Sequence, residues 1–396
     1  MDKMKKVPEI RFKEFEEEWV QSKLGDCFLE RVERSAIGEL ISITINNGVV
    51  KAADTGRADS SSADKSNYKR VEVGDIAYNS MRMWQGACGY SSYSGILSPA
   101  YTVVTPTNGV DVKFYYYLFK RTDSLYQFRI NSQGLTSDTW NLKYPCFSKI
   151  NCMVPKEPEQ KRIAELFLHI DNLISKLEQK LEKLRNIKQS LLNQMFVNVN
   201  RGGGYAPLIR FEGYGEKWQK FALGDLVSIR AGQSPSFFNK GNVPYVKVDD
   251  LNNSYWLQIN TNYRVANNDR ATLIAKNSIV FPKRGAAILT NKIRVLGENA
   301  YIDTNMMALE VSKEISSNFL GFNIENCGLF RIADTSTIPQ INNKHIEPYI
   351  VYVPKTQEQE SIEHTFVLLN GILEKSSFKL TKLRTMKQSL LQKMFV

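Results

Sequence analysis

Two groups of basic, amide and aromatic side chains in this sequence have the chemistry to bind a nucleic acid. Arg and Lys can hold phosphates or donate two hydrogen bonds to guanine, and Asn and Gln can pair in the same way with adenine. Each side chain taken singly is more typical of a solvated surface, and Trp84 of a core, so the prediction depends on the clusters. The candidate DNA contacts are Lys65, Lys69, Arg70, Tyr78, Asn79, Arg82, Trp84 and Gln85 in the first group, and Arg230, Gln233, Lys283, Arg284, Asn291, Lys292 and Arg294 in the second.

Two small polar segments follow these groups at matching positions. SQGLTSDTW contains Thr136 and Ser137, and ADTSTIPQIN contains Thr335 and Ser336. A loop that contacts phosphates and an ordinary turn are both consistent with this composition. We include the four hydroxyl side chains among the candidate DNA contacts.

The charge of the chain agrees with an anionic partner. Its 396 residues carry a formal net charge of +11, and no apolar segment is long enough to suggest a membrane span. The five cysteines form no CxxC pair, and the N-terminus has no apolar signal region. We therefore expect free thiols, a cytoplasmic location and DNA as the partner.

Motifs for catalysis are missing from the sequence. It has no Walker A motif, no GxGxxG, no His/Cys cluster at metal-ligand spacing and no [N/D/S]-P-P-[Y/F/W] motif for an extruded adenine. His169, His345 and His364 are the three histidines, and they suggest no triad. We expect no catalytic residue, no metal site and no cofactor bound by this chain.

An internal repeat organises the elements that must position these groups. Residues 154–197 and 353–396 are identical at 21 of 44 positions, with an offset of 199 and no gap. The same offset relates PEIRFKEFEEEWVQSKLGD, from residue 8, to PLIRFEGYGEKWQKFALGD, from residue 207. Because the intervening segments differ strongly, the chain consists of two related halves, joined by a linker that contains three glycines at 202–204.

The repeated ends are predicted to be long helices that pair with each other. Apolar residues alternate at spacings of four and three, with Lys188 and Lys387 at the one seam position that is polar in both copies. A helix of 40 residues is roughly 60 Å long and needs an equally long partner, so we expect antiparallel pairing within the chain. The predicted seam consists of Ile163, Phe167, Ile170, Ile174, Leu177, Leu181, Leu184 and Leu191 with Ile362, Phe366, Leu369, Leu373, Leu380, Leu383 and Leu390.

The diverged middles contain short β-branched and aromatic runs separated by Gly, Asn and Ser turns, which predicts mixed sheets. The expected fold class is α/β (α+β), with two globular mixed-sheet domains and a pair of long antiparallel coiled-coil helices. The predicted domains are residues 1–153 and 201–352, followed by helical segments at 154–200 and 353–396.

This arrangement resembles the specificity subunit of Type I restriction-modification systems. The resemblance lies in two variable domains, each opened by P-x-IRF…W…LGD and followed by VPKxxEQ and a long KLRxxKQSLLxxMF helix. WQGACGYSSYSGILSPAYTVV, from residue 84, is also similar to stretches of that family's target recognition domains. The resemblance covers essentially the whole chain.

What the resemblance implies is a non-catalytic subunit of a methyltransferase and endonuclease complex. Each target recognition domain would read one half of an asymmetric bipartite site in double-stranded DNA, and the helices would set the spacer. They would also dock two methylation subunits, which bind S-adenosylmethionine and methylate adenine at N6, and up to two restriction subunits would use ATP and Mg. A coiled-coil scaffold and a DNA-binding protein outside restriction are the alternatives, while the missing motifs disfavour an independent enzyme.

Overall fold

The computed structural model describes residues 6–56, 58, 61–197, 206–336 and 338–396. The predicted glycine linker at 202–204 lies outside the described residues. The chain packs into two compact units: unit 1 comprises Met1–Ser175 and Thr381–Val396, and unit 2 comprises Lys176–Leu380. Each unit therefore includes a segment from the other half of the sequence.

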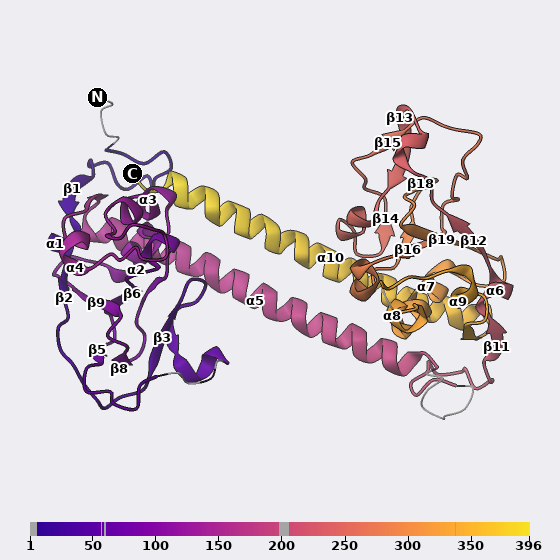
Figure 1. The fold of residues 1–396 in the computed structure, drawn as a ribbon, viewed down its shortest axis with the longest axis horizontal. Coiled ribbons are helices and arrows are strands. Elements are labelled where there is room, and N and C mark those ends of the chain that lie inside the picture. The colour runs from indigo at the N-terminus through magenta and orange to yellow at the C-terminus, as the bar shows by residue number, and fades with distance from the viewer. Residues whose placement is uncertain (1–5, 57, 59–60, 198–205, 337) are drawn as a thin grey trace. The chain divides into compact units, whose positions relative to one another are not determined.

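Unit 1 combines short strands with short helices (Figure 1). Its strands are β1 (Val20–Lys23), β2 (Phe28–Glu30), β3 (Ile41–Thr44), β4 (Gly48–Lys51), β5 (Lys69–Val71), β6 (Ile76–Asn79), β7 (Cys88–Tyr90), β8 (Gly95–Leu97), β9 (Tyr101–Pro106) and β10 (Asn151–Val154). Its short helices are α1 (Leu24–Cys27), α2 (Val112–Leu118), α3 (Thr122–Ile130), α4 (Tyr144–Phe147) and the 3₁₀ helices η1 (Ala52–Thr55) and η2 (Met83–Gln85).

Unit 2 has the same kinds of element. Its strands are β11 (Gln219–Ala222), β12 (Val227–Ala231), β13 (Lys240–Val246), β14 (Leu257–Gln258), β15 (Arg264–Val265), β16 (Ile279–Pro282), β17 (Arg294–Leu296), β18 (Tyr301–Ile302), β19 (Met306–Val311) and β20 (Ile350–Val353). Its short helices are α6 (Leu223–Leu226), α7 (Ser317–Cys327), α8 (Leu329–Ile332), α9 (Asn343–Ile346) and the 3₁₀ helices η4 (Pro235–Phe237), η5 (Val248–Asn252) and η6 (Ala286–Thr290).

The main sheets of the two units share a central pattern. Strand order is β2-β9-β6-β7 in unit 1 and β12-β19-β16-β17-β14 in unit 2, so β6 and β16 are interior strands. β6 pairs antiparallel with β9, as β16 does with β19. Parallel pairing also occurs, between β13 and β18 and between β14 and β17. These mixed sheets agree with the predicted fold class.

The two long helices are α5 (Glu157–Met195) and α10 (Thr356–Lys393). Unit 1 holds the start of α5 and the end of α10, and unit 2 holds the end of α5 and the start of α10. In unit 1, for example, Lys387 Nζ of α10 lies 2.5 Å from Asp171 Oδ1 of α5. The helices are therefore antiparallel, and the predicted fold class is confirmed.

All of the predicted seam residues are buried or partly buried. The seam does not serve helix pairing alone, because its first residues are part of the globular cores. Ile163 and Phe167 belong to the core of unit 1, and Ile362 and Phe366 to that of unit 2. The repeated apolar positions therefore also attach each long helix to a unit.

A buried ion pair joins two of the repeated motifs at the start of each long helix. In unit 1, the guanidinium of Arg11 donates to both carboxylate oxygens of Glu159, at 2.8 and 2.7 Å. In unit 2, Arg210 makes the same bidentate contact with Glu358, at 2.6 and 2.7 Å. The IRF segment of each half is thereby fixed to the helix that follows its own globular part.

The glutamine of VPKxxEQ connects the same helix starts to the globular parts. Asp111 N donates to Gln160 Oε1 at 3.0 Å, and Asp111 caps α2. In unit 2, Ser316 N donates to Gln359 Oε1 at 2.8 Å, and Ser316 caps α7. In each unit the side-chain amide of the repeated glutamine thus holds the residue that caps a short helix.

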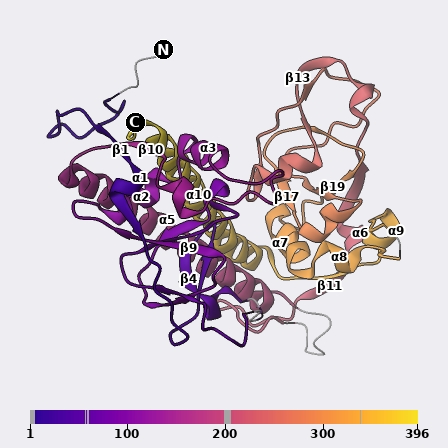
Figure 2. The same ribbon diagram turned by 60° about the vertical axis from the view of Figure 1, so that its left-hand side comes forward.

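The MFV ends of the long helices insert among aromatic rings of the unit in which they finish. In unit 1, Phe395 lies 6.3 Å from Trp19, 5.2 Å from Phe114 and 5.8 Å from Phe167, measured between ring centroids. Figure 2 shows the end of α10 in this unit, together with β1 and β10. The second half of the sequence therefore completes the core of the first unit.

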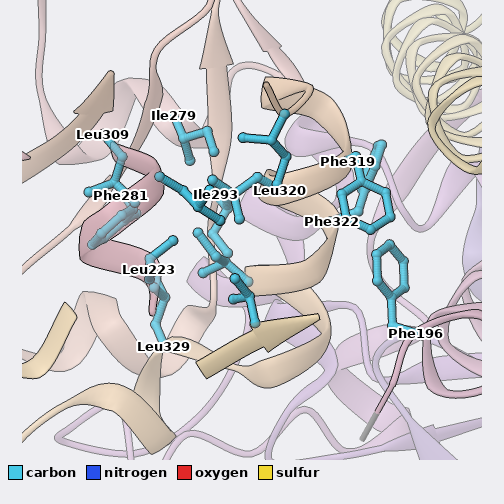
Figure 3. Packing of buried hydrophobic residues seen from close by; sticks show 14 of the residues in the cluster. Phe196, Leu223, Ile279, Phe281, Ile293, Leu309, Phe319, Leu320, Phe322 and Leu329 are labelled. Atoms are coloured by element: carbon cyan, nitrogen blue, oxygen red, sulfur yellow. The ribbon is translucent and has the colours of Figure 1, made fainter. Parts of the chain in front are cut away.

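The reciprocal insertion occurs in unit 2. Phe196 lies 6.4 Å from Trp218, 5.2 Å from Phe319 and 5.8 Å from Phe366, measured between ring centroids. Figure 3 shows Phe196 beside Phe319 and Phe322 in this core. The repeated MF dipeptide and the repeated tryptophan are thus explained by one packing contact.

We predict that Phe395→Ala and Phe196→Ala each destabilise the protein by about 3–5 kcal/mol, because a large buried ring is removed. Calorimetric unfolding would show a lowered Tm for both variants. Phe378→Ala is the control, since Phe378 of α10 is 72% exposed. A loss of stability no larger than that of the control would contradict the insertion.

Candidate nucleic-acid interface

The candidate site of unit 1 forms where β6 ends. Residues 80–85 leave this interior strand, and Leu142 N donates to Ser80 O at 2.8 Å. This bond attaches the polar loop at 133–141 to the end of β6. The two segments, which we call the paired loops of unit 1, unite two groups of residues that are far apart in sequence.

Unit 2 builds the same arrangement where β16 ends. Ile341 N donates to Lys283 O at 2.8 Å, and Gly285 N donates to Pro339 O at 2.8 Å. These bonds join residues 283–290 to the described part of the loop at 334–340, and together they are the paired loops of unit 2. The Leu142 and Ile341 contacts are equivalent, because both precede the short helix that leads to the last strand.

The polar loops are closed by matching backbone pairs. Gln133 and Asn141 exchange two hydrogen bonds at 3.0 and 2.8 Å, and Asp334 and Gln340 do so at 2.9 and 3.0 Å. Inside the first loop, Gly134 has a φ of 135°, and a Cβ there would lie 2.5 Å from the carbonyl oxygen of Thr139. Glycine is thus required for this close approach.

An aromatic pair supports a cation beside the first polar loop. The rings of Trp84 and Trp140 meet edge to face at 5.2 Å between centroids, and the Arg129 guanidinium lies 5.2 Å from the Trp140 centroid. Trp84 Nε1 also donates to Met81 O at 3.1 Å. The Trp140 ring holds the exposed Arg129 guanidinium beside the paired loops, and among the described residues this guanidinium forms no ion pair.

Basic side chains also gather at the paired loops of unit 2. Arg284 and Arg331 are exposed, and neither forms an ion pair within the described part of the chain. Burial, and then the neighbouring charge of Arg284, lower the pKa of Lys283. A phosphate placed here would favour the protonated form of Lys283 and stabilise both cations.

The structure brings part of the predicted set together in each unit. It groups Asn79, Arg82, Trp84 and Gln85 with Thr136 and Ser137, and it groups Lys283 and Arg284 with Thr335 and Ser336. Arg82, Arg284 and the four hydroxyl residues are exposed, while the other members are partly buried. DNA contact by these residues remains a prediction.

The burial of Tyr78 corrects one expectation from the sequence. Its side chain lies in the core, and its ring stacks on Phe147 at 5.2 Å between centroids. Burial also raises the pKa of the Tyr78 hydroxyl. Because β6 is an interior strand and the Tyr78 side chain is buried in the core, this residue does not face a ligand.

Asn291 and Arg294 are also occupied within the protein. Asn291 Nδ2 donates to Glu325 O at 2.8 Å, and its Oδ1 accepts from Leu329 N at 2.9 Å. Arg294 donates to backbone oxygens of Leu251 at 2.8 Å and Ser254 at 3.0 Å, and burial lowers its pKa. These contacts hold loops of unit 2 in place, so both side chains already have partners within the protein.

The remaining candidates lie apart from the paired loops or are engaged with nearby groups. Lys69 pairs with Glu30 at 3.4 Å, and Arg230 pairs with Glu310 at 2.7 Å. In unit 1, Lys65 donates to Ser62 O and Arg70 pairs with Glu72. In unit 2, Lys292 donates to Asn252, and the backbone N of Gln233 donates to Ile302 O.

Two residues of the site were not selected from the sequence. Arg129 is in the last turn of α3, and Arg331 is in the last turn of α8, so each precedes the polar loop of its unit. The signal that could have identified them is positional: a basic residue shortly before the small polar segment in both halves.

Other classes of site find no support within the described ranges. No group of three or more His, Cys, Asp or Glu residues there could hold a metal ion. None of the helices described is both long and apolar enough to cross a membrane. All five cysteines are free thiols.

Comparison with known proteins defines the class of this one. The model of the family described as "Type I restriction modification DNA specificity domain" matches residues 16–186 and 215–375. The chain therefore belongs to this family and contains two copies of its domain. Specificity subunits of these systems are the non-catalytic component that recognises DNA, and we assign that role to this chain.

Solved structures show the same fold. The chain is similar to the S subunit of a Type I restriction-modification system from M. genitalium, with 16% identity, a TM-score of 0.64 and coverage of 98% of this chain and 99% of that one. It is also similar to a chain from a structure on complex assembly and conformational transition of the type I system, with 14% identity, a TM-score of 0.56 and coverage of 95% and 97%.

We predict that Arg82→Gln and Arg284→Gln each weaken DNA binding and reduce the slope of log K against log salt by about one, because each removes one charge near the phosphates. Salt titrations of binding would measure both effects. Lys156→Gln and Lys355→Gln remove the same charge from exposed ion pairs at the starts of the long helices. Equal effects of the site and control variants would contradict the assignment.

Proposed function

We propose that this chain reads an asymmetric bipartite sequence in double-stranded DNA, with the paired loops of each unit contacting one half of it. The long helices, α5 with 39 residues and α10 with 38, set the spacer between the half-sites. At about 1.5 Å per residue, such helices have a length of roughly 60 Å.

The observation that carries this proposal is the equivalence of the paired loops. The same strand end, 3₁₀ helix and closed polar loop occur in both units, which supports one kind of ligand for both. Their side chains differ: Ser80 and Arg82 in unit 1 stand where unit 2 has Lys283 and Gly285. Because base readout depends on side-chain donors and acceptors, equivalent scaffolds with different side chains favour two different half-sites.

The proposal extends to the partners. Two methylation subunits dock on the long helices, bind S-adenosylmethionine and methylate an adenine at N6. Up to two restriction subunits, which use ATP and Mg, complete an endonuclease. The chain itself supplies recognition, and it resides in the cytoplasm with the DNA.

Exposed apolar residues on the long helices support two equivalent docking sites. Leu173 on α5 is matched by Ile372 on α10, and Ile187 on α5 is matched by Met386 on α10, each at the offset of 199. Leu173 and Met386 belong to unit 1, whereas Ile187 and Ile372 belong to unit 2. Each unit thus carries one residue from each of the two matched pairs, as docking of two identical partners would require.

Selection from random duplexes, at a stated salt concentration, tests DNA recognition. The full chain with methylation subunits should enrich two different half-sites at a fixed separation. Thr136→Ala with Ser137→Ala should relax only one half-site, and Lys283→Ala only the other. Equal relaxation of both half-sites by either variant would exclude one unit per half-site, and no enriched sequence would favour a scaffold.

Docking is tested by charge insertion on the helices. Ile187→Glu with Ile372→Glu should remove one methylation subunit from the complex, as measured by mass from light scattering, because a buried carboxylate is costly. Phe378→Glu is the control, since Phe378 is exposed but its equivalent in the first half is Gln179. Retention of both subunits would contradict the docking site, and methyl transfer by the chain alone would contradict a non-catalytic role.

A further inference from the structure

Leu135 is the most exposed large apolar side chain in the described residues. It is 100% exposed and lies in the polar loop of unit 1. The backbone around it is held in place: Thr139 N donates to Thr136 O at 2.9 Å, and Trp140 N donates to the same oxygen at 3.1 Å. The leucine therefore projects from an anchored loop, and its exposure does not come from a loose segment.

Two guanidinium groups and one carboxylate, that of the exposed Asp138, lie in the paired loops of unit 1 or beside them. Arg129 lies over the ring of Trp140, whose backbone N donates to Thr136, the residue that follows Leu135. Arg82, in the other of the paired loops, is exposed as well. A polyanion held by these guanidinium groups would lie across the loop and cover the leucine.

A single exposed leucine needs no special explanation, but unit 2 repeats the feature. Ile338, in the loop between Asp334 and Gln340, is 67% exposed and precedes Pro339, whose carbonyl accepts from Gly285 N. Arg284 is its exposed basic neighbour in the paired loops. An exposed branched aliphatic side chain is thus present in the closed polar loop of both units, near the start of the loop in unit 1 and near its end in unit 2.

We propose that Leu135 is a wedge that enters between two neighbouring base pairs of the bound DNA and unstacks them. Leucine and isoleucine are among the side chains that insert in this way, usually from the minor groove, while basic groups hold the backbone on either side. The anchored loop presents the side chain before binding, so little conformational entropy is lost on insertion. The proposal rests on the DNA recognition described above and adds deformation of the DNA to it.

The wedge has a consequence for the chemistry of the partners. Extruding a base from a duplex requires that its stacking be broken. A step already opened by Leu135 would lower the cost of extruding a nearby adenine. The recognition subunit would then prepare the substrate, although it has no catalytic group.

The test uses target duplexes from the selection experiment, with 2-aminopurine placed in turn at each step of the half-site read by unit 1. The full chain alone is added, so that no methylation subunit can extrude a base. We expect wild-type protein to raise the fluorescence at one step, because 2-aminopurine brightens when it is unstacked. Leu135→Ser should abolish the rise and weaken binding by roughly tenfold, as expected for the loss of one buried leucine side chain.

Two variants keep the outcome interpretable. Leu135→Met conserves an apolar side chain of similar size and should keep the fluorescence rise. Val73→Ala removes another exposed apolar group, at 66% exposure, which precedes the start of β6, whereas the paired loops follow its end. This control should leave fluorescence and affinity unchanged, and unchanged thermal unfolding of all variants would show that folding is not affected.

Two results would overturn the wedge. The first is a duplex that binds without any change in fluorescence, or with a rise that survives Leu135→Ser. The second is a flat fluorescence signal combined with weaker binding of Leu135→Ser that is seen on thymine-containing duplexes and not on duplexes with uracil in place of thymine. Leu135 would then contact a thymine methyl group. Failure to select any target duplex would instead contradict the proposed DNA recognition.

Discussion

The insertion of each helix end into the core of the opposite half is the contact on which the rest of the structure depends. Phe395 completes a ring cluster with Trp19 in unit 1, and Phe196 completes one with Trp218 in unit 2. Neither half of the sequence can therefore build its whole core alone. Antiparallel pairing of α5 and α10 follows, because each helix must begin in one unit and end in the other.

Charged pairs accompany this packing at the starts and near the ends of the long helices. The Arg11–Glu159 and Arg210–Glu358 pairs place nearly inaccessible carboxylates at the helix starts. Such pairs add little net stability compared with apolar packing, but removing one partner is costly. Lys188 with Glu325, and Lys387 with Asp171, continue the pattern at the helix ends. We expect these charged partners to favour one alignment of the helices, because another alignment would leave a buried charge without its partner.

This framework separates what must stay constant from what can vary. The repeated motifs meet around the helix starts and ends, where both units need the same contacts. The paired loops lie at the ends of β6 and β16 and contribute little to those contacts. Side chains there can change without loss of the core, which suits a family whose members recognise DNA through two copies of one domain. Divergence at the loops and repetition in the framework are two results of the same architecture.

The sequence by itself determined the repeat, the long helices and the fold class, because these depend on local periodicity and on matched residues at a constant offset. It also placed Arg82, Thr136, Lys283 and Arg284 among the candidates. Only the tertiary structure decided which candidates face outward, since Tyr78 and Arg82 are four positions apart and look equally suitable in sequence. Tyr78 is buried because β6 is an interior strand, and the hydrogen bond from Leu142 to Ser80 attaches the polar loop to the segment that contains Arg82. Burial and long-range hydrogen bonds depend on residues distant in the chain, which no local pattern encodes.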